Sequence, residues 1–343
     1  MKASYHKYIL NFKQPSGTSR GVMTTKETWL IKIEDQGKIG LGECGLLRGL
    51  SFDDCYTYES QLKDVCAQIN LRKHEQLNLT KWPSIQFGVE QAFHSLQCQN
   101  TFKLFPSKFT NGEDSIPING LIWMGTEAFM RAQIKEKIKA GFTCIKLKIG
   151  AIDFETELNI LKSIRKEFSK KDIVLRVDAN GAFKPGEALE KLNRLSEFDL
   201  HSIEQPIKPK QFDDMASLCE NTPVPIALDE ELIGVFNLHD KAKLLQVVKP
   251  QYIILKPSLI GGYKASQEWI DIAEALNINW WVTSALESNI GLNAIAQWTY
   301  TLKNNLPQGL GTGGLFTNNF DSPLTVKNGT LHYDNYLKWI TNL

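Results

Sequence analysis

The hydrophobic positions follow different periods in the first third of the chain and in the rest. Apolar and polar residues alternate over residues 5–12 and 28–33, and a turn at Gln36-Gly37 leads into a further short strand over residues 38–42. Helical spacing follows over residues 53–69 and 83–96. The pattern predicts an α+β domain over residues 1–112 that opens with an antiparallel sheet.

From residue 116 the pattern repeats an apolar strand, a polar loop and an amphipathic helix. Phe154, Leu158 and Leu161, for example, share one helical face. The predicted strands are residues 116–122, 144–148, 173–178, 202–204, 226–229, 252–256, 280–284 and a short run near Leu310. Eight strands with intervening helices predict an α/β fold, a TIM-like barrel of the (β/α)7β type, over residues 113–314.

Two segments outside these repeats carry separate predictions. Asn328-Gly329 lies between short apolar runs and favours a type I′ hairpin, so residues 315–343 are expected to return to the first domain. Residues 14–21 form a polar, glycine-containing stretch between the first two strands. A mobile surface loop is the simpler interpretation, and a lid that turns Arg20 toward an anionic substrate is the alternative.

Composition narrows the class of protein. The chain has 343 residues and 38.8 kDa, enough for a barrel of roughly 250 residues and a second domain of about 100. Its 39 basic and 38 acidic residues nearly balance, which argues against nucleic acid or an anionic membrane as partner. No signal peptide or long apolar run is present, so we expect a cytoplasmic protein. Its six scattered cysteines are expected to be reduced and mostly buried.

Three acidic residues end consecutive predicted strands. Asp178, Glu204 and Asp229 are 26 and 25 residues apart, about the length of one strand plus one helix. Any one of them alone is more simply explained as a helix cap or a loop residue. Together they predict a preassembled cation site, and carboxylate oxygens are the ligands that suit Mg²⁺ or Mn²⁺.

Three lysines belong to the same predicted barrel. Lys146 and Lys148 are two apart on one strand and therefore point to the same face. If that face is the interior, the two ammonium groups should lower each other's pKa, whereas exposed lysines are the alternative. Lys256 ends a strand four places further on, opposite them in an eight-stranded ring. A lysine on each side of a bound carboxylic acid is an arrangement for removing the proton next to the carboxylate.

At these residues the sequence resembles the enolase superfamily. The matching motifs, in family order, are Lys146-Leu147-Lys148, Arg176-Val177-Asp178-Ala179-Asn180, Ile203-Glu204-Gln205-Pro206, Ala227-Leu228-Asp229-Glu230 and Leu255-Lys256-Pro257, and Gly40-Leu41-Gly42-Glu43 is similar to the family's capping domain. The arrangement is that of the muconate lactonizing enzyme subgroup. Residues 117–123, 256–262, 284–291 and 309–312 look most like its o-succinylbenzoate synthases.

That resemblance implies a reaction in menaquinone biosynthesis. The substrate, 2-succinyl-6-hydroxy-2,4-cyclohexadiene-1-carboxylate, would be dehydrated to 2-succinylbenzoate with the help of Mg²⁺, so the enzyme would be a carbon-oxygen lyase. Lys148 would remove the α-proton and assist the loss of hydroxide, and Lys256 would stabilise the enediolate. Lys146 would adjust the properties of Lys148.

Other assignments stay open from the sequence. Ser284, Gly311 and Thr312 are expected to contact substrate and Asn180 to support the metal ligands, although ordinary loop chemistry explains them equally well. A dipeptide epimerase or an N-acylamino acid racemase on the same scaffold is the rival function, and a catalytically silent binding protein is a second. Residues 311–314 lack the Asp-x-Asp that epimerases typically carry there. A homo-oligomer is neither predicted nor excluded.

Overall fold

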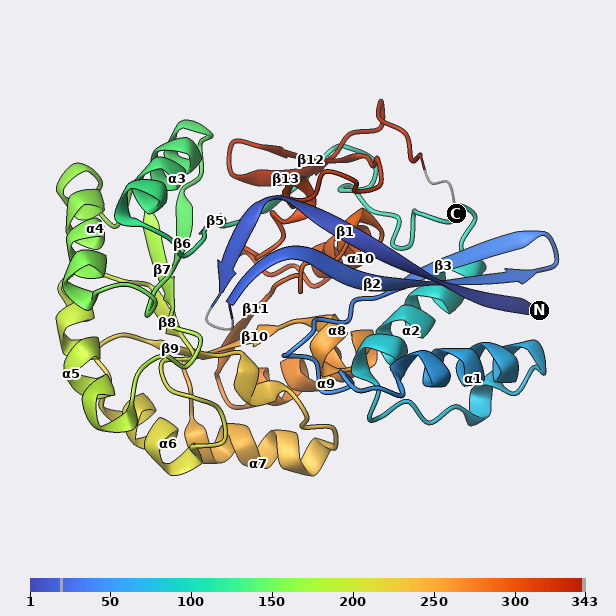
Figure 1. Cartoon of the computed structure of the whole chain (residues 1–343), viewed down its shortest axis with the longest axis horizontal. Coiled ribbons are helices and arrows are strands. Elements are labelled where there is room, and N and C mark those ends of the chain that lie inside the picture. Colours follow the sequence, from blue (N-terminus) through green and yellow to red (C-terminus); the bar gives the residue numbers. More distant parts are fainter. Residues whose placement is uncertain (19–20, 341–343) are drawn as a thin grey trace.

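Three β-sheets with packed helices make up the described part of the chain. The computed structural model of the chain describes residues 1–18 and 21–340 (Figure 1). One sheet is parallel and has seven strands, and two smaller sheets are antiparallel. The parallel sheet carries the residues on which the functional argument depends.

The seven strands of the parallel sheet follow one another in space as they do in sequence. They are β5 (Gly120–Ile122), β6 (Cys144–Lys148), β7 (Val174–Asp178), β8 (Ser202–Glu204), β9 (Ile226–Leu228), β10 (Tyr252–Leu255) and β11 (Asn279–Val282). Such an order requires a crossover after each strand. The repeat of strands and helices predicted from the hydrophobic pattern is therefore confirmed.

Helices form the crossovers and cover the outside of the curled sheet (Figure 1). They are α3 (Glu127–Lys139), α4 (Phe154–Glu167), α5 (Pro185–Ser196), α6 (Phe212–Asn221), α7 (Leu238–Val248), α9 (Gly262–Ala275) and α10 (Asn289–Thr301), with the short α8 (Pro257–Ile260) directly after β10 and the 3-10 turns η2 (Glu230–Leu232) and η3 (Gly313–Leu315). Their apolar faces pack on the sheet as the periodicity predicts. Leu158, Leu161 and Ile164 of α4, for instance, are buried.

The two edges of the parallel sheet meet at a short segment near Leu310. Gln308 donates its backbone N–H to Pro117 O at 2.8 Å, on the β5 side. Gly309 donates to Val282 O at 2.8 Å, on the β11 side. This segment lies where the eighth strand was predicted and pairs in parallel with both neighbours.

The predicted strand over residues 116–122 is wrong in one respect, because it is divided between two sheets. Strand β4 (Ser115–Pro117) pairs antiparallel with β13 (Thr330–Tyr333), and only β5 joins the parallel sheet. The chain changes sheets at residues 118 and 119, where Asn119 bonds to Gln308 O. A continuous apolar run cannot reveal such a change of partner.

The N-terminal sheet consists of β1 (Lys2–Thr18), β2 (Gly21–Asp35) and β3 (Lys38–Cys44), and α1 (Tyr58–Asn70) and α2 (Pro83–Gln97) pack on it. A 3-10 turn, η1 (His74–Gln76), connects the two helices. The described part of residues 14–21 continues β1 and β2, so the predicted loop is instead the end of a long hairpin. Gly17 forms a bridge to Met124, just beyond β5, and thereby brings the hairpin to the parallel sheet. Arg20 lies outside the described residues.

The C-terminal segment contacts both β4 and the N-terminal sheet. Strands β12 (Leu324–Lys327) and β13 (Thr330–Tyr333) form the predicted hairpin, with positive φ at Asn328 (50°) and Gly329 (70°). Strand β13 pairs with β4, whereas residues 316–318 bond to β1, where the Tyr8 hydroxyl donates to Asn318 O at 2.7 Å. The expected contact with the N-terminal region is therefore present, in addition to a sheet formed with β4.

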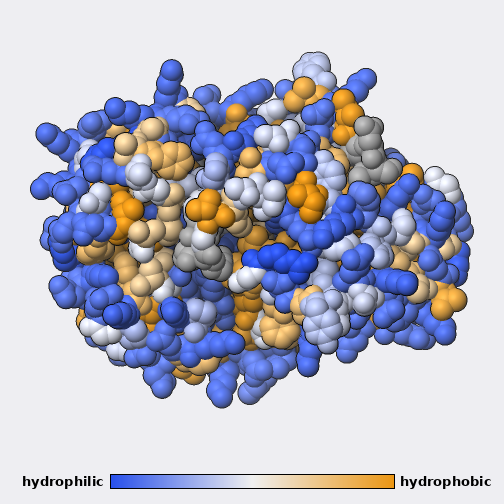
Figure 2. Space-filling model, in the orientation of Figure 1, coloured by the Kyte–Doolittle hydropathy of each residue, from blue (hydrophilic) through white to orange (hydrophobic). Residues whose placement is uncertain are grey.

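The surface shown is mostly hydrophilic, and the cysteines are unpaired. The face in Figure 2 is mainly hydrophilic with smaller hydrophobic areas. All six cysteines are free, and four of them are buried. Within residues 1–18 and 21–340, none of the helices has both the length and the apolar character to cross a membrane.

Two glycines of β3 allow α2 to lie directly on the N-terminal sheet. A Cβ at Gly40 would lie 2.0 Å from Ala92 O, and a Cβ at Gly42 would lie 1.9 Å from Gly88 O. Both obstructing atoms belong to the backbone of α2, which cannot yield without moving the helix. The two positions are alternate residues and therefore share one face of the strand.

We expect Gly42→Ala to lower the free energy of unfolding by at least about 1–3 kcal/mol, because the added methyl group forces α2 away from the sheet. Gly186→Ala in α5 is the matched control, since a Cβ there meets nothing within 4 Å. That change should be neutral or stabilising. Urea denaturation measures both, and an equally stable Gly42→Ala protein would show that the close approach is not required.

Candidate active site

The acidic and basic residues singled out in the sequence meet at one edge of the parallel sheet. Lys148, Asp178 and Glu204 are the last residues of β6, β7 and β8, and they are paired directly across the strands. Asp229 and Lys256 come immediately after β9 and β10. The carboxyl ends of parallel strands lie at the same edge, which brings these residues together although 108 positions separate Lys148 from Lys256.

The charged groups form an alternating series of ion pairs. Lys146 Nζ contacts Asp178 Oδ2 at 3.1 Å and also Glu204 Oε2. Lys256 Nζ contacts Asp229 Oδ2 and lies 3.7 Å from Glu204 Oε1. At the other end, Lys148 Nζ is 2.9 Å from Asp178 Oδ2. Three ammonium groups thus balance three carboxylates in a region that is largely closed to solvent.

The lysine pKa values differ from the expectation based on sequence. Burial alone lowers the pKa of Lys146, but the Asp178 and Glu204 carboxylates outweigh it and the net shift is upward. The pKa of Lys256 is also raised, because Asp229 and Glu204 overcome the effect of burial. The predicted lowering by a second lysine is therefore wrong for Lys146, whose nearest charged groups are carboxylates.

The three carboxyl groups are not equivalent. Burial raises the pKa of Asp178, but Lys146 and Lys148 outweigh it and hold this pKa below its usual range. Burial and the neighbouring Asp178 charge raise the pKa of Glu204. Burial likewise raises the pKa of Asp229, against the opposing effect of Lys256. Asp178, which contacts two lysines, is the carboxylate that this environment stabilises most.

Asn180 orients Lys148. Its side-chain oxygen accepts a hydrogen bond from Lys148 Nζ at 2.7 Å, and its Nδ2 donates to Glu230 Oε1 at 3.0 Å. The residue adopts a left-handed conformation (φ 44°) that Asn tolerates, and its backbone N–H bonds to Asp178 Oδ1. Asn180 therefore links two of the predicted site residues through its side chain and backbone.

The carboxylates fit a divalent cation in their chemistry. All their donor atoms are oxygens, and Glu204 Oε1 is buried without a hydrogen bond among the described residues. However, no three Asp, Glu, His or Cys side chains of residues 1–18 and 21–340 are grouped closely enough to hold a metal ion as they stand. In this arrangement lysines supply the counter-charge to these acids, and the cation site stays a prediction.

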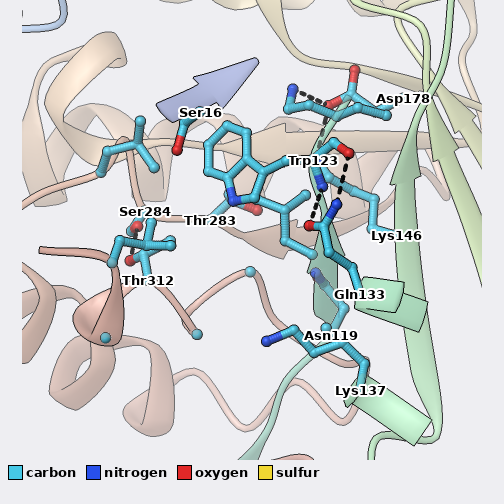
Figure 3. A pocket seen from close by; sticks show the side chains of 18 of the residues that line it. Ser16, Asn119, Trp123, Gln133, Lys137, Lys146, Asp178, Thr283, Ser284 and Thr312 are labelled. Atoms are coloured by element: carbon cyan, nitrogen blue, oxygen red, sulfur yellow. Dashed lines mark hydrogen bonds and ion pairs between the residues drawn. The ribbon is translucent and has the colours of Figure 1, made fainter. Parts of the chain in front are cut away.

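A cavity of about 480 Å³ opens over this edge (Figure 3). Lys146, Lys148, Asp178, Asn180 and Lys256 line one side of it. Glu204 and Asp229 are not among its lining residues and lie buried. The described hairpin residues Gln14 and Ser16 reach the cavity from β1, and Leu47 and Leu50 reach it from the segment after β3.

The predicted substrate contacts lie on the opposite wall. Ser284 Oγ and Thr312 Oγ1 are hydrogen-bonded to each other at 2.6 Å, and Gly311 lines the cavity beside them. Figure 3 shows this pair on the side away from Lys146 and Asp178, with Trp123 between the two groups in that view. A substrate held near the lysines can therefore extend toward Ser284 and Thr312.

The sequence interpretation missed three polar or aromatic residues of the cavity. Asn119 lies where the chain passes from β4 to β5, and Trp123 directly follows β5. The side-chain amide of Gln133 in α3 binds the backbone of Trp123. Its oxygen accepts from the Trp123 backbone N–H at 2.9 Å, and its nitrogen donates to the Trp123 backbone carbonyl at 3.1 Å. The position of Trp123 directly after β5 could have indicated a residue at the site, whereas no local sequence pattern indicated Gln133.

We expect Lys146→Met to destabilise the chelator-treated protein by about 3–5 kcal/mol, because Asp178 and Glu204 lose a shared buried counter-ion. Thermal denaturation in EDTA measures the effect. The matched control is Lys170→Met, which removes the exposed Lys170–Asp199 pair and should change stability little. Equal melting temperatures for both variants would contradict a compensating role of Lys146.

Comparisons with known proteins agree with the geometry of the site. The family model described as "Enolase C-terminal domain-like" matches residues 129–335, which is more than half of the chain. A second model, described as "MenC, N-terminal domain", matches residues 1–96. The chain therefore belongs to the enolase superfamily, whose members use a divalent metal ion.

Within the superfamily, the chain is similar to o-succinylbenzoate synthases over nearly its full length. It is 44% identical to the o-succinylbenzoate synthase of Desulfotalea psychrophila, covering 96% of this chain and 98% of the relative. The crystal structure of MenC from the same organism superposes with a TM-score of 0.86 at 42% identity, covering 97% and 99% of the two chains. The L-Ala-D/L-Glu epimerase of Bacillus subtilis shares the fold, with a TM-score of 0.80 at 21% identity over 97% and 96%.

Proposed function

We propose that the protein is an o-succinylbenzoate synthase that dehydrates 2-succinyl-6-hydroxy-2,4-cyclohexadiene-1-carboxylate to 2-succinylbenzoate in menaquinone biosynthesis. The observation that carries this proposal is the meeting of Lys148, Asp178 and Lys256 at one cavity edge in a chain 44% identical to such an enzyme. The substrate carries two carboxylates. The lysines at one wall and the hydroxyl pair at the other provide groups for both of them.

Asp178, Glu204 and Asp229 are the residues that we propose to hold the divalent cation, with Mg²⁺ as the first candidate and Mn²⁺ as the second. When bound, such a cation stabilises negative charge that develops on a substrate carboxylate. The all-oxygen donor set and the unbonded Glu204 Oε1 support this assignment. Asn180 would support it from outside through Asp178 and Glu230.

Lys148 is the proposed base. As a neutral amine it accepts the α-proton of the substrate, and the electrons of the broken C–H bond pass into the carboxylate to form an enediolate. The enediolate electrons then return to the ring and form its third double bond as the C–O bond at the ring hydroxyl breaks, and the departing hydroxide takes the proton from Lys148 and leaves as water. Loss of water from a cyclohexadiene by itself gives an aromatic ring, so no oxidant or reductant is needed.

In this proposal Lys256 and Lys146 act through their charges and transfer no proton. Lys256 stays charged, as the upward shift of its pKa favours, and stabilises the enediolate. Lys146 is more deeply buried than Lys148 and contacts two carboxylates, which suits adjustment of the charge around Lys148 better than proton transfer.

The finer architecture belongs to the same proposal. Residues 113–314 would form a (β/α)7β barrel closed through Gln308 and Gly309, and residues 1–112 would form the capping domain, to which residues 315–343 return. The hydrogen bonds of that segment with both sheet edges and the bridge between Gly17 and Met124 support this division. A cytoplasmic location and a contact of Arg20 with substrate stay predictions.

Epimerisation on the same scaffold is the second candidate, because a lysine on each side of a carbon acid also permits proton exchange. The fold of the Bacillus subtilis epimerase is shared. The cavity wall at residues 311–314 is Gly-Thr-Gly-Gly, which offers no carboxylate to pair with a substrate ammonium group. This favours a substrate without a cationic end.

The central test is to incubate the protein and Mg²⁺ with the cyclohexadiene substrate and, separately, with dipeptides in deuterated water. Lys148→Ala and Asp178→Asn should each lower the dehydration rate by at least about 10²–10⁴-fold, because one removes the base and the other a metal ligand. Circular dichroism should show an unchanged fold.

Lys162→Ala, an exposed lysine of α4, is the matched control and should retain full activity. Full activity in Lys148→Ala would exclude this lysine as the base. Deuterium entering recovered dipeptides faster than the cyclohexadiene is dehydrated would favour the epimerase instead.

Metal binding has a separate expected outcome. Mg²⁺ at 100 times its dissociation constant should stabilise the wild-type protein by about 2.7 kcal/mol, since the folded state alone binds it. Glu204→Gln should lose most of this stabilisation, whereas Glu187→Gln on the exposed side of α5 should keep it. Thermal denaturation across a Mg²⁺ titration measures this, and equal stabilisation of both variants would refute the assigned ligands.

A further inference from the structure

A second group of buried charges lies between the N-terminal sheet and the parallel sheet, outside the lining of the cavity. Its members are Lys26 on β2, Glu43 on β3 and Glu287 in the segment after β11, with exposed fractions of 3%, 0% and 0%. None of them has a part in the reaction proposed above. Burying three charged side chains is costly, so their contacts require an explanation.

Glu43 joins the N-terminal sheet to the start of α10. One carboxylate oxygen accepts hydrogen bonds from Thr28 Oγ1 at 2.7 Å and from the Ser288 backbone N–H at 2.8 Å. The other accepts from the Ser288 hydroxyl and from the Gly291 N–H at 2.8 Å. Ser288 is the N-cap of α10, so a carboxylate of one sheet satisfies the first turn of a helix that covers the other.

Glu287 joins two segments that border the cavity. Its Oε1 accepts a hydrogen bond from the Ser258 hydroxyl, and its Oε2 accepts from the Ala285 N–H at 2.6 Å. Ser258 is two residues beyond Lys256, and Ala285 lines the cavity beside Ser284. The same side chain therefore contacts both the helix that follows one proposed catalytic lysine and the wall that would receive the far end of the substrate.

The cavity wall requires such support because of its backbone. Leu286 has a φ of 63°, a left-handed conformation that is unfavourable for a residue with a branched apolar side chain. Its neighbours Ala285 and Glu287 carry the hydrogen bond just described. A strained conformation persists only where surrounding contacts determine it.

Lys26 adds a buried basic group to these two acids. Its Nζ makes no hydrogen bond to any residue that the structure describes. Burial lowers the pKa of Lys26, and the charges of Glu43 and Glu287 oppose this lowering. Burial raises the pKa of Glu287, the charge of Lys26 opposes this rise, and the charge of Glu43 adds to it. In a buried region such charge interactions act over more than contact distance.

The chain after β3 passes directly over this point. A Cβ at Gly45 would lie 2.6 Å from Ser258 Oγ and 2.9 Å from Glu287 Cγ, so only glycine fits. Two residues later, Leu47 lines the cavity. The cavity wall that contains Leu47 and the wall that contains Ala285 thus both depend on the position of Glu287.

We propose that Glu287, balanced by the charge of Lys26, is a positioning residue that holds the cavity wall of residues 283–286 against α8 and the chain that follows β3. By fixing this wall, Glu287 positions the residues that would contact the end of the substrate farthest from the lysines. This inference rests on the proposed function for the kinetic part of its test and on the fold alone for the rest.

Lys26→Met is the first variant, and Lys241→Met is its matched control. Lys241 is also a buried lysine, paired with Glu268 at 2.7 Å between α7 and α9, and it does not line the cavity. Both variants should lose stability. Only Lys26→Met should raise KM for the cyclohexadiene substrate, by at least about tenfold with kcat changed less than about threefold, because the wall shifts while the lysines stay in place.

Amide hydrogen exchange provides a readout that needs no substrate. Residues 284–291 should exchange faster in Lys26→Met than in the wild-type protein, and at the wild-type rate in Lys241→Met. Absence of dehydration in the wild-type protein would refute the proposed function alone, since the exchange pattern is measured independently. Unchanged exchange and unchanged KM in a folded Lys26→Met protein would overturn the positioning role.

Substitutions of Glu287 test the hydrogen bonds separately from the charge. In Glu287→Gln the amide oxygen can accept from the Ala285 N–H and the amide nitrogen can donate to Ser258 Oγ, so KM should stay near the wild-type value. Glu287→Ala loses both bonds and should raise KM at least about tenfold. Adding Glu287→Gln to Lys26→Met should restore most of the lost affinity, because Glu43 no longer faces a second carboxylate.

The pair of Glu287 variants keeps the inference testable even if Lys26→Met does not fold. A KM that is equal in Glu287→Ala and Glu287→Gln would overturn the proposal. A large difference between them, with exchange at residues 284–291 faster only in the alanine variant, would support it.

Discussion

The neutralisation of buried carboxylates by buried lysines at one edge of the parallel sheet is the interaction on which the rest of this structure depends. Three acids and three lysines would each be expensive to remove from water alone. The register of β6, β7 and β8 places Lys148, Asp178 and Glu204 side by side, so that the charges compensate one another. The same arrangement supplies the chemical groups of the proposed reaction.

The N-terminal part of the molecule completes this edge. Its glycines Gly40 and Gly42 permit α2 to pack at backbone distance, which makes a firm support for the segment after β3. Leu47 and Leu50 of that segment line the cavity, and Glu43 caps α10 from across the interface. The N-terminal sheet and the parallel sheet therefore both contribute walls of the cavity, and neither sheet forms the cavity alone.

The function follows from details of the cavity more than from the fold. The fold is shared with an epimerase at a TM-score of 0.80, so the fold does not by itself distinguish the proposed dehydration from epimerisation. We propose that the far wall separates the two chemistries, and this chain has Ser284, Thr312 and a run of glycines there. A substrate with a second carboxylate suits this wall better than one with an ammonium group.

The sequence alone determined the order of strands and helices and the strand ends at which Asp178, Glu204, Asp229 and the lysines lie. It could do so because alternation, helical periodicity and the spacing of polar residues at strand ends are local or regular along the chain. The tertiary structure alone decided the division of residues 116–122 between two sheets, the extension of residues 14–18 in a long hairpin, and the raised pKa of Lys146. It also decided the contact of Glu43 with Ser288, 245 positions away. Each of these depends on which distant groups approach within a few ångströms, and a pattern along the chain carries no information about such contacts.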